Sequence, residues 1–140
     1  MTEVICTAAA VILLAVNAVQ DIRKREIFLM FTVVMAAAGA VFSLVSGSAG
    51  PAELLLSALP GVFLAAFSFL SDGGAGMGDA IVLAALGTWE GPQDVWTVFM
   101  ISLLFSSAAA VILIVKGKSR AGIPFVPFVL AGYLAMLFLF

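Results

Sequence analysis

Long, largely charge-free stretches alternate along the chain with short polar breaks. The breaks carry nearly all the charge, together with Gly-Ser and Gly-Pro turn signals. The apolar segments span about residues 4–20, 28–47, 52–71, 79–89, 95–115 and 122–140. Because a membrane-crossing helix needs about 20 apolar residues, the pattern predicts an all-α integral membrane protein. We expect about six transmembrane helices, formed by residues 1–140 as a single membrane domain.

The fourth segment is shorter than the others. Residues 79–89 give only about 16 Å of helix, half of a hydrocarbon core about 30 Å thick. Two arrangements follow. Either the bilayer is thinned there, or Asp79 lies below the cytoplasmic surface in a protein-lined recess that water can reach, where irregular backbone is tolerated at membrane depth. The glycine-rich stretch before Asp79 favours a recess.

Composition supports a lipid environment and excludes several classes of function. The chain is 64% hydrophobic and only 10% charged, with a mean hydropathy of +1.28, so it cannot cover a water-soluble domain with polar surface. Its net charge of −2 argues against nucleic-acid binding. The absence of His and the single Cys6 exclude a disulfide framework and a Cys/His zinc site. We expect no metal and no other cofactor.

The basic residues orient the helices. They fall in two loops, after the first and the fifth apolar segments: Arg23, Lys24, Arg25, Lys116, Lys118 and Arg120. The positive-inside rule places both loops in the cytoplasm, which puts both chain termini outside and the loop 72–78 inside. The residues expected on the outer side are then acidic: Glu3, Glu53, Glu90 and Asp94. We therefore expect a multi-pass protein of the inner (cytoplasmic) membrane.

Two aspartates stand out because they lie at membrane depth. Asp21 precedes the basic cluster, and Asp79 opens the short fourth helix. An ionisable group so placed costs about 2.5–3.5 kcal/mol, which makes it a functional candidate. The structural alternatives are a first-turn carboxylate on the helix dipole for Asp79 and an ion pair with Arg25 for Asp21. Glu26 and Asp72, in contrast, lie in cytoplasmic loops, where a solvated surface role is common.

Two carboxylates that meet in a recess can hydrolyse an amide. Close like charges do not both ionise readily, so the pair holds one proton, and one member acts as general base while the other acts as general acid. Neither a metal nor a covalent intermediate is needed. Gly76 and Gly78 leave the flank of Asp79 without side chains, which would let a substrate backbone approach.

Three motifs resemble those of the type IV prepilin peptidases. Gly76-Met77-Gly78-Asp79 matches the GxGD motif of intramembrane aspartyl proteases, and residues 76–87 are similar to the corresponding stretch of that family. Residues 21–27 resemble its first aspartate motif, and residues 122–128 resemble its IPFGPF segment. The three occur in the family's order along nearly the whole chain.

The resemblance implies a function and a set of site residues. Asp21 and Asp79 would be the catalytic pair. Further motif residues are Gly76, Gly78, Ile123, Pro124, Phe125 and Pro127. The substrates would be membrane-inserted prepilin-like precursors, such as Flp-type pilins or preflagellins, cut at the cytoplasmic face after a basic leader. Glu26 and Asp72 would then steer the leader.

The chain resembles the short, peptidase-only members of that family, since it has no room for the cytoplasmic methyltransferase domain of the larger members. It departs from many members at three places: Phe28-Leu29 stands where Pro-Asn is common, Ile81 where Lys is common, and Val126 where Gly is usual. Two other functions stay open. One is a small transport or assembly subunit whose aspartates relay protons, and the other is an inactive, peptidase-like binding protein.

Overall fold

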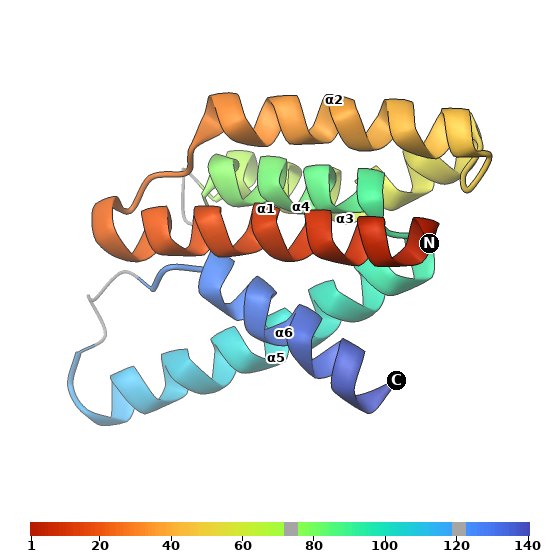
Figure 1. Ribbon diagram of the computed structural model, residues 1–140. Helices are drawn as coiled ribbons and strands as arrows, with labels where there is room; N and C mark the ends of the chain where they lie inside the picture. The colour runs from red at the N-terminus through yellow and green to blue at the C-terminus, as the bar shows by residue number, and fades with distance from the viewer. Residues whose placement is uncertain (72–75, 119–122) are drawn as a thin grey trace.

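The computed structural model describes residues 1–71, 76–118 and 123–140. These residues form six helices in chain order: α1 (Thr2–Lys24), α2 (Leu29–Ser46), α3 (Pro51–Leu70), α4 (Met77–Trp89), α5 (Pro92–Val115) and α6 (Val126–Leu139) (Figure 1). Four of them, α1, α2, α3 and α5, are long and apolar enough to cross a membrane, while α4 and α6 are shorter apolar helices. The predicted all-α fold with a short fourth helix is therefore confirmed.

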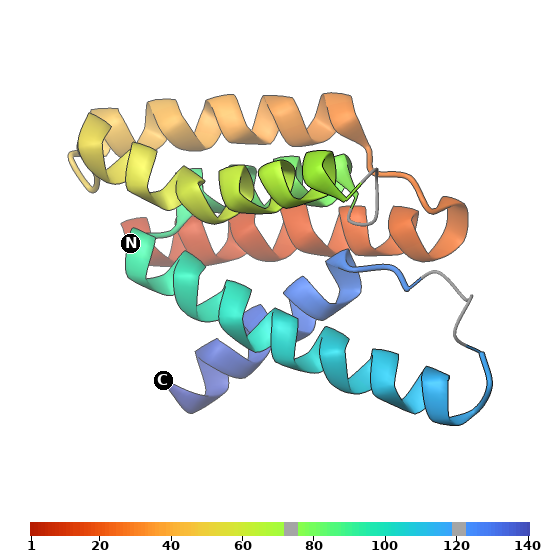
Figure 2. The same ribbon diagram turned by 180° about the vertical axis from the view of Figure 1, so that it is seen from behind.

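The short helix α4 lies at the centre of the molecule. It contacts each of the other five helices, and nearly half of its residues are buried. Figures 1 and 2 show α2 above it, α1 and α3 on its two sides, and α5 and α6 crossing beneath. Because neighbouring helices surround α4, protein rather than lipid covers its sides. This arrangement explains how a helix of half the usual length is accommodated.

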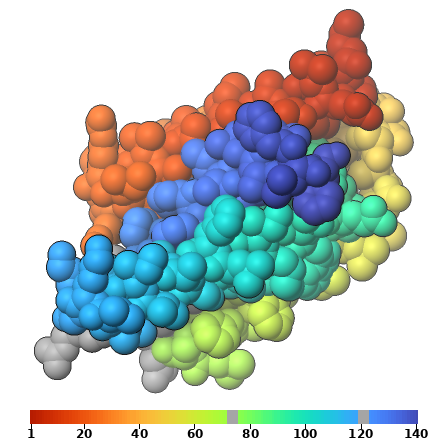
Figure 3. All heavy atoms as spheres, turned by 90° about the horizontal axis from the view of Figure 1, so that it is seen from below, coloured from red at the N-terminus to blue at the C-terminus, as the bar shows by residue number. Residues whose placement is uncertain are grey.

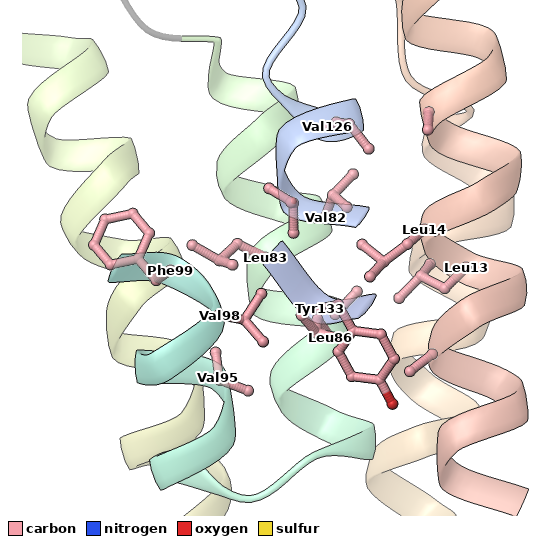
Figure 4. Close-up of a cluster of buried hydrophobic side chains, with 14 of the residues drawn as sticks. Leu13, Leu14, Val82, Leu83, Leu86, Val95, Val98, Phe99, Val126 and Tyr133 are labelled. Carbon is pink, nitrogen blue, oxygen red and sulfur yellow. The ribbon is translucent and has the colours of Figure 1, made fainter. Parts of the chain in front are cut away.

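An apolar core fills the space between α1, α4, α5 and α6. Figure 4 shows the side chains that meet there: Leu13, Leu14, Val82, Leu83, Leu86, Val95, Val98, Phe99, Val126 and Tyr133. Large apolar side chains also project outward from every helix, among them Val45, Phe69 and Phe138. From below, α5 and α6 cover the core between α1 at one edge and α3 at the other (Figure 3). Such an apolar exterior suits a lipid surround.

Glycines allow α4 to lie close to its neighbours. A Cβ atom added at Gly87 would collide with the backbone oxygen of Ser57 in α3, and one added at Gly61 in α3 would lie 2.7 Å from the backbone oxygen of Ala80. Small residues that let backbones approach are typical of helix packing in membranes, where apolar burial alone does not drive association. The position of α4 against α3 therefore depends on these two glycines.

Two helices differ in extent from the apolar segments of the sequence. α1 continues through Lys24 rather than ending near residue 20, so Asp21 lies on a helix. In the sixth apolar segment, about residues 122–140, the helix α6 begins only at Val126. Pro124 explains the late start, since a proline disfavours helical backbone at the preceding residue and offers no N–H. α6 is consequently too short to cross a bilayer unaided.

Polar contacts fix the end of the core at which α4 ends. The Tyr133 hydroxyl of α6 donates a hydrogen bond of 2.6 Å to Oε1 of Glu90, the residue that follows α4. Thr7 of α1 lies near this hydroxyl. Both chain termini lie at this same end (Figure 1), as an even number of crossings requires. This bond thus ties α6 to the end of α4, beside α1, at the end of the bundle that carries the termini.

Candidate active site

A cavity of about 580 Å³ opens at the other end of the bundle, where α1 ends and α4 begins. Its walls come from the last turns of α1, the α1–α2 connection, the start of α4 and the segment that leads into α6. The lining residues are Asp21, Arg25, Glu26, Ile27, Leu29, Gly76, Met77, Gly78, Asp79, Ile81, Ile123, Pro124 and Phe125. Side chains from all three sequence motifs therefore meet in one cavity.

Asp21 is buried and is held by the N-terminus of α6. Its Oδ2 atom accepts a hydrogen bond of 3.2 Å from the backbone N–H of Val126, a residue 105 positions further along the chain. The next residue, Pro127, has no N–H, and the N–H groups of Phe128 and Val129 bond to the Phe125 oxygen. The N–H of Val126 is the donor of this first turn that reaches the carboxylate. The start of α6 therefore orients Asp21.

Asp79 is held by its own helix. It is the third residue of α4, after Gly76 in the N-cap position. The Asp79 carboxylate accepts a hydrogen bond from the backbone N–H of Gly76, while the Gly76 oxygen accepts the N–H of Asp79 at 3.2 Å. This is the returning half of a capping box. The structural alternative expected for Asp79, a carboxylate of the first turn, is thus the way in which α4 presents this side chain to the cavity.

The two carboxylates are close enough to interact through their charges. Arg25, four residues after Asp21, also acts on Asp21 electrostatically, although the hydrogen bond of that carboxylate goes to Val126. Among the residues that the structure describes, no group of three or more His, Cys, Asp or Glu side chains could hold a metal ion. The cavity is therefore lined by two carboxylates that interact through their charges.

The sequence profile of the type IV leader peptidase family matches residues 8–115. The chain belongs to the type IV leader peptidase family. The match takes in both aspartates and ends before the third motif, so the role of that motif rests on the geometry just described. No curated protein and no solved structure matches the chain significantly. The protein is therefore a multi-pass membrane enzyme of the aspartic prepilin peptidases.

The glycines of the peptidase's second motif also make close contacts within the chain. That Gly76 and Gly78 let a substrate backbone approach stays a prediction. A Cβ atom at Gly78 would lie 2.9 Å from Cγ1 of Ile27, and one at Gly76 would lie 2.8 Å from Oδ2 of Asp79. The peptidase's own side chains therefore take the space beside both glycines. Gly78 lets the α1–α2 connection approach α4, and Gly76 lets the carboxylate fold back over the helix start.

Some of the remaining predicted site residues line the cavity and others do not. Ile123, Pro124 and Phe125 line the cavity, whereas Pro127 lies outside its lining, at the second position of α6. Glu26 lines the cavity and is exposed. Asp72 lies outside the described residues.

Sequence reasoning missed Asn17, which is fully buried one turn before Asp21. Its Oδ1 atom accepts the N–H of Phe28 and the hydroxyl of Thr32, both at 3.1 Å, and its Nδ2 donates to the Leu13 oxygen at 2.9 Å. An asparagine inside an apolar run is the signal that was available. Its partners lie 11 and 15 positions away, so the sequence did not reveal them.

Proposed function

We propose that this peptidase removes the leader from type IV prepilin-like precursors at the cytoplasmic face of the inner membrane, with Asp21 and Asp79 as its catalytic pair. One observation carries the proposal: two aspartates from separate motifs line one cavity and interact through their charges. Flp-type pilins and preflagellin-like precursors are the substrates that the motif resemblance suggests.

The reaction uses the pair as a unit. The ionised carboxylate takes a proton from a water molecule, whose oxygen attacks the carbonyl carbon of the scissile amide. The protonated carboxyl group donates a hydrogen bond to the carbonyl oxygen as negative charge develops there. When the C–N bond breaks, a proton passes to the leaving amine, giving a free carboxyl group and a new N-terminus. The orientation of Asp21 by Val126 and of Asp79 by Gly76 supports this geometry.

The depth of the cavity restricts the substrate. The cavity lies beside the basic cluster of residues 23–25, which the positive-inside rule assigns to the cytoplasm. A recess at this level admits an extended segment just outside a transmembrane helix, but not the middle of such a helix, whose amides are engaged in backbone hydrogen bonds. Exposed Glu26 at the cavity favours a leader that carries Lys or Arg.

The test is cleavage of a purified Flp-type prepilin in detergent, followed by the mobility shift on a gel. We expect wild-type protein to cut, and Asp21→Asn and Asp79→Asn each to lose roughly 10²–10⁴-fold in rate. The double variant should lose little more, because the two groups act in one step. The matched control is Glu53→Gln, which removes a carboxylate from the first turn of α3 and keeps its acceptor oxygen for the Gly50 N–H.

Two results would favour the alternatives. A wild-type protein that binds the precursor without cutting it would be the inactive binding protein. If Asp79→Asn cut the precursor at the wild-type rate, Asp79 would not be a catalytic residue. Because detergent solution holds no proton gradient, cleavage there also separates a peptidase from a proton-relaying subunit.

A further inference from the structure

The connection between α1 and α2 forms one wall of the cavity. It carries Arg25, Glu26 and Ile27, all of which line the cavity, and it passes from the end of α1 to the start of α2 (Figure 1). Ile27 packs against Gly78, the residue immediately before Asp79. The position of this connection therefore bears on how Asp79 approaches Asp21.

A tight turn at Phe28 ends the connection. The Leu29 N–H donates to the Ile27 oxygen at 3.0 Å around Phe28, whose φ of −82° and ψ of 81° are those of an inverse γ-turn. The turn leaves the N–H of Phe28 itself without a partner in the local backbone. Asn17 supplies the partner through Oδ1, at 3.1 Å.

Asn17 is well placed to act as a fixed anchor. It lies on α1 four residues before Asp21, and both of its side-chain polar atoms are engaged within the chain. Thr32, in the first turn of α2, donates to the same Oδ1 atom. One buried amide thus joins α1, the γ-turn and α2 at the level just below the cavity.

We infer that Asn17 is a positioning residue for the reaction, holding the α1–α2 connection so that Ile27 supports Gly78 and the adjacent Asp79. This inference rests on the proposed function. The path from Asn17 to the reacting group is short: the hydrogen bond to Phe28, the peptide bond to Ile27, and the contact with Gly78.

The backbone angle at Phe28 offers a direct test of this role. A φ of −82° is close to the −65° at which a proline ring fixes this angle. Proline at position 28 would keep the turn and remove the N–H that Asn17 serves.

The experiment measures kcat and KM for prepilin cleavage in four proteins: wild type, Asn17→Leu, Asn17→Leu with Phe28→Pro, and Asn17→Leu with Phe28→Ala. Asn17→Leu leaves the Phe28 N–H without its partner, and we expect about a tenfold loss of kcat with KM unchanged. Adding Phe28→Pro should restore most of kcat. Adding Phe28→Ala should not, because alanine removes the ring and keeps the N–H.

A second measurement does not depend on activity. Limited trypsin digestion in detergent reports how firmly the connection is held, since the exposed residues Arg23, Lys24 and Arg25 stand at its start. Cutting there should be faster in Asn17→Leu and return to the wild-type rate with Phe28→Pro. Ser102→Ala removes a buried polar group elsewhere, a hydroxyl bonded within α5, and should change neither readout.

The outcomes separate this inference from the proposed function. If wild-type protein does not cut the prepilin, the proposed function fails, and the trypsin pattern alone decides whether Asn17 anchors the connection. If wild-type protein cuts and Asn17→Leu keeps its kcat, the inference is overturned. It is also overturned if adding Phe28→Pro to Asn17→Leu fails to restore kcat. If Asn17→Leu alone does not fold, the inference is overturned when adding Phe28→Pro fails to restore the yield of folded protein.

Discussion

At the scale of single residues, the contact between Ile27 and Gly78 joins the two aspartate motifs. Ile27 ends the first motif, and Gly78 directly precedes the second aspartate. A Cβ atom at Gly78 would lie 2.9 Å from Cγ1 of Ile27 and 3.1 Å from its Cδ1, both closer than ordinary contacts. A side chain at position 78 therefore requires either a shift of the Ile27 side chain or a separation of the two motifs.

We expect Gly78→Ala to lower kcat, since overpacking of this kind costs about 1–3 kcal/mol and falls on the residue next to Asp79. Ile27→Ala in the same protein should recover part of the loss by removing the atoms that the new methyl group meets. Both are measured by prepilin cleavage, together with melting temperature in detergent. Gly91→Ala is the control, because Gly91 also lies at the N-terminal end of a helix but has open space around it. A Gly78→Ala protein with wild-type kcat would contradict this account.

The sequence indicated the two aspartates for a physical reason and missed their supports for another. A carboxylate within an apolar run is costly, so Asp21 and Asp79 were visible without any knowledge of the fold. The donor that holds Asp21 is a backbone N–H, which every residue except proline carries. Nothing in the sequence distinguishes the N–H of Val126 from the others. Ile27 fills the space beside Gly78. The sequence could not show this either, because the two residues are far apart in the chain.

At the scale of helices, the packing of α4 against α3 depends on the absence of side chains. Gly87→Ala would force a methyl group against the Ser57 backbone oxygen, and backbone cannot move aside as a side-chain end can. We expect a clear fall in melting temperature, corresponding to about 1–3 kcal/mol, while Gly91→Ala should leave the melting temperature unchanged. If the two variants melted alike, the close approach of α3 and α4 would not be contributing to stability.

The hydrogen bond between Tyr133 and Glu90 introduces a dependence on pH. Burial raises the pKa of Glu90 above its ordinary value of 4.5, with the nearby Asp94 adding to the rise, although the Tyr133 hydrogen bond opposes it. The folded protein therefore binds this proton more tightly than the unfolded chain does. The resulting stability is fully present below pH 4.5 and is lost as the pH rises through the raised pKa.

Glu90→Gln removes this titration and keeps an acceptor oxygen for Tyr133. We expect the variant to melt at a higher temperature than wild type at neutral pH, with the difference shrinking as the pH falls towards 4.5. Melting curves in detergent across this range measure it. A difference that stayed constant with pH would assign the effect to packing instead. Tyr133→Phe should lower the melting temperature at neutral pH, because Glu90 loses its buried donor.

At the scale of the whole molecule, the end of the bundle with the termini and the end with the cavity must face opposite sides of the membrane. Ser48, in the turn after α2, and Ser71, at the end of α3, are both exposed. In a Cys6→Ala background, we expect an impermeant maleimide added outside intact cells to label Ser48→Cys but not Ser71→Cys. Labelling of residue 71 from outside would show that the protein has the opposite orientation, with its cavity facing away from the cytoplasm.

The segment count and the short α4 could be read from hydrophobicity, because membrane thickness sets both. The crossing of α5 and α6 beneath the bundle could not. These helices are apolar around most of their circumference, so the pattern offers no face that must point inward. Their placement follows from close packing and from a few polar contacts, such as that of Tyr133 with Glu90.

The hydrogen bond between Asp21 and Val126 also links activity to the order in which the helices are synthesised. A membrane protein leaves the ribosome from its N-terminus, so both aspartates enter the bilayer while α6 is still unsynthesised. Until then, Asp21 lacks its donor, and the cavity lacks the wall made by residues 123–125. On the proposed function, a nascent chain halted after α5 would carry every reacting group and still cut poorly. Competence would arrive only once α6 has been synthesised and has reached the other helices.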